Sequence, residues 1–213
     1  MDKKSKPIII SLVFVLFFGG SAAFACTNFL FTKGATIDGS TMITYACDAH
    51  VFYGELYYWP AKHHPKGAML DVYEWDGGKF RGQIKQVPYT YSVLGLMNEH
   101  QVSIGETTYG GREELHNPDG IIDYGSAMFI ALQRSKTARE AIHVIASLCE
   151  EYGYCSSGES FSISDPNEVW IMDLIGKGPG QKGILWVARR IPDGYISGHA
   201  NHARIRRFPL KDP

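Results

Sequence analysis

The order of the predicted elements constrains the fold of this chain more than any single motif. Segments with alternating or β-branched apolar residues predict strands in two blocks, and only the middle of the chain has the apolar spacing of helices. Strands, then two helices, then strands favour antiparallel sheet with helices packed on one face, and not alternating βαβ units. The sequence therefore predicts an α+β fold.

Two helices are predicted in the middle of the chain. The first runs from Asp123 to Ser135, where apolar residues recur at helical spacing. The second opens at a capping box between Thr137 and Glu140 and ends near Gly153. A turn is predicted over 97–101, and strands are predicted over 27–32, 41–47, 51–59, 71–75, 80–87, 89–96, 102–107, 159–164, 168–175, 183–191 and 195–197.

Several glycine-rich patterns mark turns. Asp-Gly pairs at 38–39 and 76–77 separate predicted strands, which is typical of β-hairpins. Residues 178–183 fit the G-x-G-x-x-G pattern of nucleotide-binding loops, but a β-branched segment follows them where that motif requires a helix. We therefore predict that residues 178–183 form a hairpin loop.

Histidine pairs give no metal signature. His199 and His202 have H-x-x-H spacing, and His63 and His64 are adjacent. No Cys or carboxylate completes either pair at the spacing of a zinc site. The sequence therefore predicts no metal ion and no cofactor.

The first 25 residues have the organisation of a secretory signal. Lys3, Lys4 and Lys6 precede an apolar stretch over 8–18, which is too short for a membrane-spanning helix, since that needs about 20 residues. An A-x-A site ends at Ala25. The sequence thus predicts a signal peptide over 1–25, cleavage after Ala25, and export to the periplasm or the cell exterior.

Cleavage there makes Cys26 the first residue of a mature chain over 26–213. A thiol is nucleophilic only as the thiolate, and a free cysteine has a pKa of about 8.5, so a base is needed. A free α-amine has a pKa near ~7.7–8.0 and belongs to the same residue, so it can take the thiol proton. No Cys-His signature of the papain type is visible around any of the four cysteines.

Two other interpretations of Cys26 stay open from the sequence. The cysteine is either incidental or the acceptor of a lipid anchor, which would make the chain a non-enzymatic surface protein. Phe24 is bulky where lipoprotein signals take small residues, and Ala23 lies where they prefer Leu. We therefore favour the nucleophile.

Length and composition limit the size of the domain and the kinds of partner that this chain can have. Removal of 25 residues from 213 leaves enough chain for one domain with a full core, and 45% of the whole is hydrophobic. The mature part has a net charge near −3, too mild to indicate a nucleic-acid partner, and it has no second apolar stretch long enough for a membrane helix. Cys149 and Cys155 are close enough to form a disulfide, but both can equally be buried thiols.

Several segments that follow the A-x-A site resemble segments of the secreted PepD-like dipeptidases, and they occur in the same order along the chain. These dipeptidases are cysteine-type N-terminal-nucleophile (Ntn) hydrolases, related to secernins and to the bile-salt hydrolase and penicillin V acylase group. The resemblance covers essentially all of the chain after Ala25. It is carried by the segments Cys26 to Leu30, Asp38 to Ile43 with Asp48, Met97 to His100, Gly105 to Thr108, Ser160 to Asp165 and Gly198 to Ile205.

The resemblance implies an αββα sandwich, with two packed antiparallel sheets and helices outside. It implies that Asp48 contacts the amine of Cys26 and that Asn201 donates to the oxyanion. It also implies that Thr108 faces the substrate site. Relatives in the acylase group carry Arg where this chain has Tyr45, so Tyr45 is expected to contact substrate by hydrogen bonding and not by charge.

The implied activity is hydrolysis of dipeptides by the Cys26 thiolate, with small peptides as substrates. The alternative within the same machinery is hydrolysis of N-acyl amides such as bile-salt conjugates. Relatives run considerably beyond the position of Pro213, so we expect this chain to be the N-terminal portion of a longer domain. The sequence does not indicate an oligomeric state.

Overall fold

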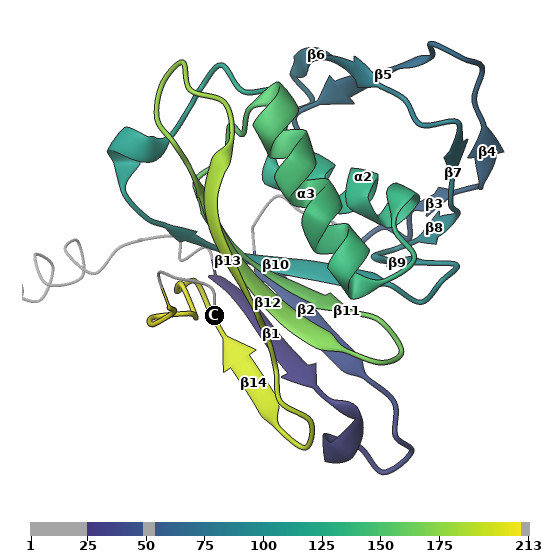
Figure 1. Cartoon of the computed structure of the whole chain (residues 1–213), viewed down its shortest axis with the longest axis vertical. Coiled ribbons are helices and arrows are strands. Elements are labelled where there is room, and N and C mark those ends of the chain that lie inside the picture. Colours follow the sequence, from purple (N-terminus) through teal and green to yellow (C-terminus); the bar gives the residue numbers. More distant parts are fainter. Residues whose placement is uncertain (1–24, 49–53, 210–213) are drawn as a thin grey trace, which may run out of the picture.

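The computed structural model describes residues 25–48 and 54–209. The described residues form three layers, in which two helices cover one face of a seven-stranded sheet and a three-stranded sheet covers the other face (Figure 1). The helices are α2 (Tyr124–Arg134) and α3 (Ala138–Tyr152). This arrangement confirms the predicted α+β sandwich of two packed antiparallel sheets with helices outside. Among the described residues both α-helices cover the larger sheet, so the second helix layer of an αββα sandwich is not seen there.

The larger sheet is antiparallel throughout and has the strand order β13-β12-β11-β10-β9-β8-β3. Its long central strands pack beneath the helices, and its short strands lie at one edge. The strands are β3 (Tyr58–Trp59), β8 (Val93–Leu94), β9 (Met97–Asn98), β10 (Ser103–Gly110), β11 (Gly158–Ser164), β12 (Val169–Gly176) and β13 (Ile184–Arg190).

The smaller sheet has the antiparallel order β14-β1-β2, with β1 (Ala25–Phe31) between β2 (Met42–Asp48) and β14 (Ile196–His199). Strand β1 therefore pairs with a strand close in sequence and with one from the far end of the described chain. A one-turn 3₁₀ helix, Lys33–Ala35, follows β1.

Two small two-stranded sheets complete the fold beside α2. One pairs β4 (Lys62–His63) with β7 (Tyr89–Thr90), and the other pairs β5 (Met69–Tyr73) with β6 (Phe80–Lys85). The β5–β6 connection contains Gly78 at a φ of 66°, a left-handed conformation that favours glycine and explains the hairpin predicted there. A second 3₁₀ helix, Glu113–Leu115, precedes α2.

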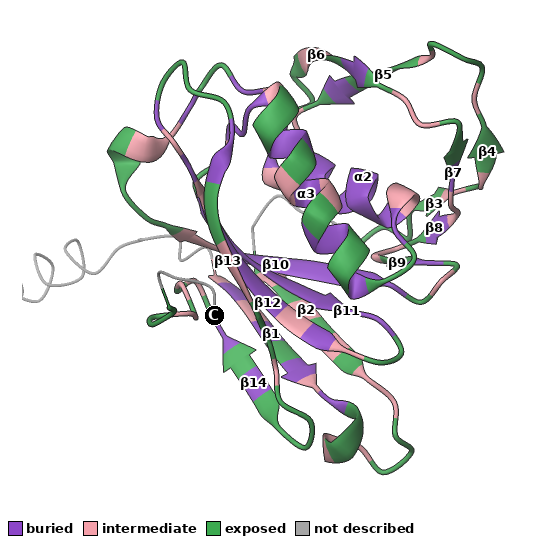
Figure 2. Ribbon diagram, viewed as in Figure 1, coloured by how far each residue is buried: buried purple, intermediate pink, exposed green. Residues whose placement is uncertain are grey.

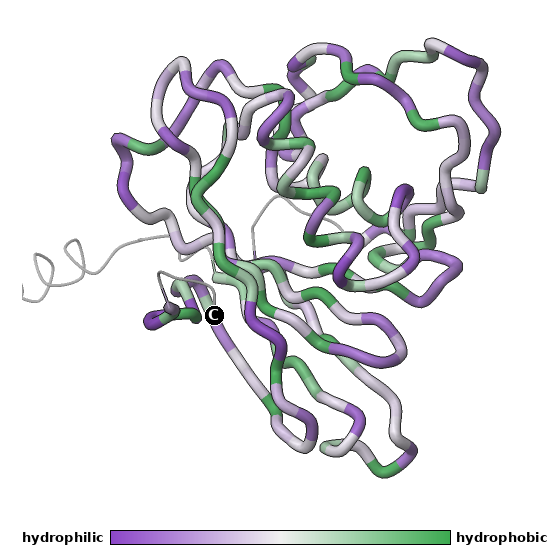
Figure 3. The backbone as a smooth tube through the Cα atoms, viewed as in Figure 1, coloured by the Kyte–Doolittle hydropathy of each residue, from purple (hydrophilic) through white to green (hydrophobic). Residues whose placement is uncertain are grey.

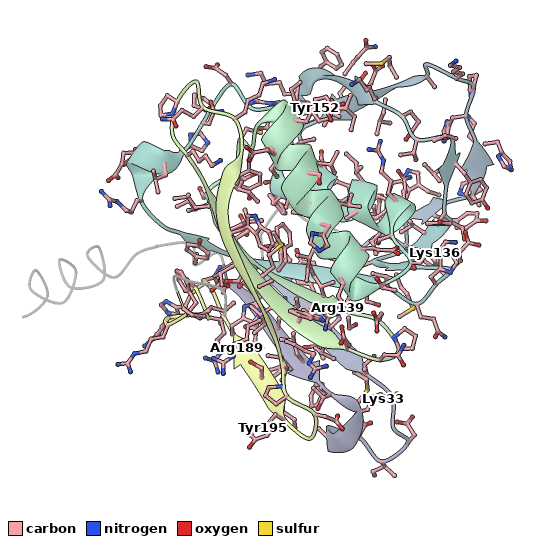
Figure 4. All side chains as sticks on the ribbon, in the orientation of Figure 1. Lys33, Lys136, Arg139, Tyr152, Arg189 and Tyr195 are labelled. Atoms are coloured by element: carbon pink, nitrogen blue, oxygen red, sulfur yellow. The ribbon has the colours of Figure 1, made fainter. Side chains whose placement is uncertain are left out.

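Both helices begin where their capping residues predict. The side chain of Asp123 accepts a hydrogen bond from Ser126 N, and that of Thr137 accepts one from Glu140 N. The capping box is modified, because the Glu140 carboxylate accepts from Lys136 N instead of returning to Thr137. Figure 4 labels Tyr152, the last residue of α3, and Lys136, which precedes the N-cap of this helix.

The two faces of the larger sheet differ in chemistry. The helix side carries the main apolar core, which includes Ile104, Phe161 and Ile163 (Figures 2 and 3). The face toward the smaller sheet carries buried hydroxyl groups, with a small apolar cluster around Leu30 at one end only. Buried polar groups require hydrogen-bond partners, and these hydroxyl groups find theirs across the sheet–sheet interface, as Ser162 does with Asn28 and His199.

Two predicted strands, 51–59 and 89–96, are wrong in extent. Of 51–59, only the last two residues form β3, while 51–53 lie outside the described residues. The predicted strand 89–96 is divided between β7 and β8, because Tyr91 N turns aside to donate to Gln133 O of α2. The predicted turn over 97–101 includes β9, and the 178–183 loop joins two antiparallel strands as predicted.

Cys149 and Cys155 are buried free thiols, so the disulfide considered from the sequence is not formed. Apart from Ala25, the predicted signal segment lies outside the described residues. Within the described part of the chain, none of the helices has the length and apolarity needed to cross a membrane.

Asp123 offers a test of the capping geometry. It is buried, and it accepts hydrogen bonds from Ser126 N at the start of α2 and from Trp75 N in the neighbouring hairpin. We expect Asp123→Ala to lower the free energy of unfolding by about 2 kcal/mol, because two backbone donors lose their acceptor. Urea unfolding measures this, with the exposed Asp119→Ala as the control. Equal losses in the two variants would contradict the capping role.

Candidate active site

Cys26 lies near the start of β1 with its side chain directed into the sheet–sheet interface. Alternate residues of β1 are buried, and Cys26 retains only 9% of its accessible surface. Its partner across the antiparallel pair is Cys47 of β2, and the two Sγ atoms are 3.8 Å apart. Two thiols from neighbouring strands therefore face each other, with Cys26 buried and Cys47 half-buried.

The backbone nitrogen of Cys26 is held by a residue from the far end of the described chain. Cys26 N donates to Asn201 Oδ1 at 2.8 Å, and Asn201 Nδ2 donates to Thr108 O at 2.7 Å. Asn201 has a φ of 49°, a left-handed conformation that Asn tolerates better than most residues. The amide of Asn201 thus links β1 to β10 and fixes the position of the Cys26 nitrogen.

Tyr45 connects the thiols to a buried carboxylate. Its hydroxyl donates to Glu106 Oε1 at 2.8 Å, and its Cβ lies against Gly105, where any side chain would be only 3.0 Å away. The absence of a side chain at Gly105 therefore lets β2 approach β10 closely. One carboxylate oxygen of Glu106 lies within 4.8 Å of the Sγ atoms of Cys26 and Cys47.

A second carboxyl group lies beside Glu106. Glu159 of β11 accepts from Thr108 Oγ1 at 2.9 Å, and Thr108 and Glu159 are direct partners in the β10–β11 register. Glu106 and Glu159 each expose only 1% of their surface, and with both carboxyl groups ionised the Oε2 atom of each has no hydrogen-bond donor among the described residues. Burial and the neighbouring Glu106 raise the pKa of Glu159 well above its usual range.

The surroundings of Cys26 disfavour negative charge on sulfur. Burial, with Glu106 and Cys47 beside it, raises the pKa of the Cys26 thiol to about 12. In the chain described here Ala25 still precedes Cys26, so its nitrogen is a peptide N–H that can neither accept a proton nor carry a charge. The thiol of this form is therefore protonated at neutral pH.

A cavity of about 440 Å³ opens beside these residues, between the edge of the larger sheet and α2. Tyr45 and Cys47 line it at the thiol end, and no Lys, Arg or His of the described chain lines it. A larger cavity of about 630 Å³ lies between β5 and α2 but contains no cysteine, so we assign the site to the smaller one. The remaining wall of the smaller cavity includes Glu55, Tyr57, Trp75, Asp76, Tyr124 and Phe129.

His199 has a structural role, because both of its ring nitrogens are hydrogen-bonded to buried hydroxyl groups. Its Nδ1 is 2.7 Å from Thr107 Oγ1 and its Nε2 is 2.9 Å from Ser162 Oγ, so both ring nitrogens are occupied. Burial lowers the pKa of His199 and keeps the ring neutral. Asp173, which accepts from Ser160 Oγ and Ile205 N, anchors the segment that follows Asn201.

The structure brings four of the five predicted site residues together. Cys26, Asn201, Thr108 and Tyr45 form one connected group, in which Asn201 contacts the Cys26 nitrogen. The oxyanion role expected for Asn201 needs Nδ2, which here donates to Thr108, so that role stays a prediction. Asp48 pairs with Ala25 and is exposed, on the opposite face of β2 from Cys47, and its contact with the amine also stays a prediction.

Three residues of the group were missed from the sequence. The register of the predicted first hairpin already places Cys47 opposite Cys26. Glu106 and Glu159 carried a different signal, because each is an ionisable residue in a strand otherwise made of small or apolar residues. Thiol and carboxylate atoms of Cys26, Cys47 and Glu106 lie close enough to share a metal ion, but binding would occupy the candidate nucleophile, and the absence of a metal stays a prediction.

Comparisons with known proteins place most of this chain in one peptidase family. The model of Peptidase family C69 matches residues 55–213. A probable dipeptidase of Latilactobacillus sakei is 26% identical over 209 residues, which cover 89% of this chain and 42% of that protein. A dipeptidase of Bifidobacterium longum is 27% identical, covering 88% of this chain and 39% of that protein. The chain spans about two fifths of the length of these relatives.

The pairing of Cys26 with Cys47 predicts a disulfide under oxidising conditions. Partners in an antiparallel pair have Cα atoms about 4.5–5.5 Å apart, within the range that a disulfide requires. We expect diamide, which accepts the two hydrogens, to link Cys26 to Cys47 and to block alkylation of Cys26 until dithiothreitol is added.

Peptide mapping of the oxidised protein measures this outcome. The variant Cys47→Ser is the matched control, and its Cys26 should remain open to alkylation after diamide treatment. A bridge between Cys149 and Cys155, or four unchanged thiols, would contradict the prediction.

Proposed function

Because the chain belongs to Peptidase family C69, we propose that it is a cysteine-type dipeptidase whose nucleophile is Cys26. The base in this proposal is the α-amine that cleavage after Ala25 would create. The observation that carries it is the hydrogen bond from Cys26 N to Asn201 Oδ1, which holds this nitrogen at a fixed place beside its own buried thiol. The dipeptidase names of two relatives support the choice of substrate.

The proposed reaction is covalent and proceeds in two stages. The free amine takes the thiol proton, and the thiolate attacks the peptide carbonyl to form the sulfur–carbon bond. The protonated amine then returns the proton to the departing amino group as the peptide bond breaks. Water, deprotonated by the same amine, hydrolyses the thioester and releases the first amino acid and the thiol.

In this proposal Asn201 orients the amine of Cys26, and backbone N–H groups bind the oxyanion. Asn201 orients the amine through Oδ1, as it orients the peptide nitrogen in the structure. The tetrahedral oxyanion needs donors such as backbone N–H groups, each worth about 3–4 kcal/mol where such a donor has been removed elsewhere. For Asn201 to join them, its Nδ2 has to leave Thr108 O, to which it now donates.

Export and signal cleavage are part of the proposal, because the mechanism needs a free amine. A peptide nitrogen cannot act as a base, whereas a nearby ammonium group favours the thiolate. The proposed protein is therefore inactive before cleavage and active in the periplasm or outside the cell. A lipid anchor on Cys26 is less well supported, since Phe24 is bulky where lipoprotein signals take small residues and Ala23 lies where they prefer Leu.

Variants at the junction test the mechanism. We expect Cys26→Ala to abolish dipeptide hydrolysis and Cys26→Ser to lower kcat/KM by at least about a thousand-fold, because a hydroxyl is much harder to deprotonate. An uncleavable residue placed before Cys26 should silence the enzyme while the thiol is intact.

Dipeptide hydrolysis followed by release of free amino acids measures these effects, and mass spectrometry of the N-terminus confirms that each chain begins as designed. The buried, distant Cys149→Ala serves as the cysteine control and should retain activity. Full activity of the extended form would mean that another group is the base.

The pH dependence of alkylation gives a second test. With a pKa of about 12, roughly one Cys26 thiol in ten thousand is ionised at pH 8 in the chain that retains Ala25. The pKa is raised, so reactivity is low below it and rises about tenfold per pH unit as the pH increases. We expect iodoacetamide to label the cleaved form at least tenfold faster at pH 8, measured by peptide mass spectrometry. Equal rates would contradict the role of the amine.

A further inference from the structure

Resting on the proposed function, we propose that Glu106 binds the α-ammonium group of the substrate's amino-terminal residue. This contact would restrict the site to peptides with a free amino terminus. It would therefore separate dipeptides from the N-acyl amides that a related machinery hydrolyses.

The first step is a distance. Attack requires the substrate carbonyl carbon to approach the Cys26 sulfur to about 3–3.5 Å. In an amino acid the α-nitrogen is two bonds from that carbon, about 2.5 Å away. A carboxylate oxygen of Glu106 lies within 4.8 Å of Cys26 Sγ, so an ammonium group on the attacked residue can hydrogen-bond to it.

The second step is the unused bonding capacity of Glu106. An ionised carboxylate accepts about four hydrogen bonds. Glu106 accepts one from the Tyr45 hydroxyl and a second from the neutral carboxyl group of Glu159, which leaves part of its accepting capacity unused. Tyr45 thus acts as a positioning residue that aims the carboxylate. A side chain that is 1% exposed and only partly hydrogen-bonded is unusual in a native protein and indicates a missing partner.

The third step is charge. Burial and the charge of the neighbouring Glu106 raise the pKa of Glu159 well above its usual range, which favours the neutral form of Glu159. The cavity is lined by the carboxylates of Glu55 and Asp76, and by no Lys, Arg or His among the described residues. A buried charge without a counter-ion is costly, and a ligand cation removes that cost. An ammonium group is the cation that a dipeptide supplies at the required distance.

The same charge distribution would make the site select free dipeptides over N-acylated peptides. An N-acylated substrate brings no cation and leaves the Glu106 charge unpaired. Sites built to pair with a polar substrate group reject the analogue that lacks it by about 10⁴–10⁵. The substrate carboxylate is repelled by this cavity, so we place the carboxyl-terminal residue of the dipeptide toward its open side.

The test measures binding separately from hydrolysis. In Cys26→Ala protein, cleaved to begin at residue 26, we expect alanyl-alanine to bind at pH 7 at least about 30-fold more tightly than N-acetyl-alanyl-alanine by calorimetry. Binding of the free dipeptide should weaken above pH 8, because its ammonium group loses its proton there. Adding Glu106→Gln should remove both the preference and the pH dependence, and Glu151→Gln, an exposed matched change on α3, should leave both unaltered.

Two results would overturn the inference: an equal affinity for the two peptides, or a preference that survives Glu106→Gln. Thermal unfolding of the Glu106→Gln protein checks that it is folded, and Tyr45→Phe, which removes only the donor to Glu106, should reduce the preference in a folded protein. Loss of all hydrolysis in the unsubstituted enzyme would refute the proposed function alone, since the binding preference does not depend on the thiol.

Discussion

The candidate site depends on the position of β1 between β2 and β14. Pairing with β2 places Cys47 opposite Cys26, and pairing with β14 brings the segment that carries Asn201 to the Cys26 nitrogen. Because each register fixes which side chains face inward, a one-residue slip of β1 would turn the thiol outward. The position of the candidate nucleophile thus depends on all three strands of the smaller sheet.

The contact between the two sheets gives this geometry its chemistry. Small residues on β10 and β11 let the sheets approach, as Gly105 does for Tyr45. Their hydroxyl groups satisfy Asn28 and His199, so the interface is polar without orphaned donors around the histidine. The apolar core on the helix side holds the larger sheet rigid, and the polar interface positions the reactive groups.

Electrostatics connects the proposed mechanism with the proposed specificity. The thiol, Glu106 and Glu159 are three acidic groups in one buried place, and nothing cationic among the described residues balances them. Two amines can supply the missing charge: the one freed at Cys26 and the one carried by the substrate. In the proposed mechanism, such a site would be silent before cleavage of its own chain and selective for substrates with a free amine after it.

The sequence by itself determined the order of strands and helices, the starts of α2 and α3, the first hairpin and the candidate nucleophile. These features depend on caps, turns and apolar periods that act over a few residues. Only the tertiary structure decided that Asn201 contacts the Cys26 nitrogen across 175 residues of sequence, while Asp48 faces outward. It also decided that Tyr45 reaches Glu106 and that 89–96 divides into β7 and β8, because such contacts are set by how sheets pack and not by any local pattern.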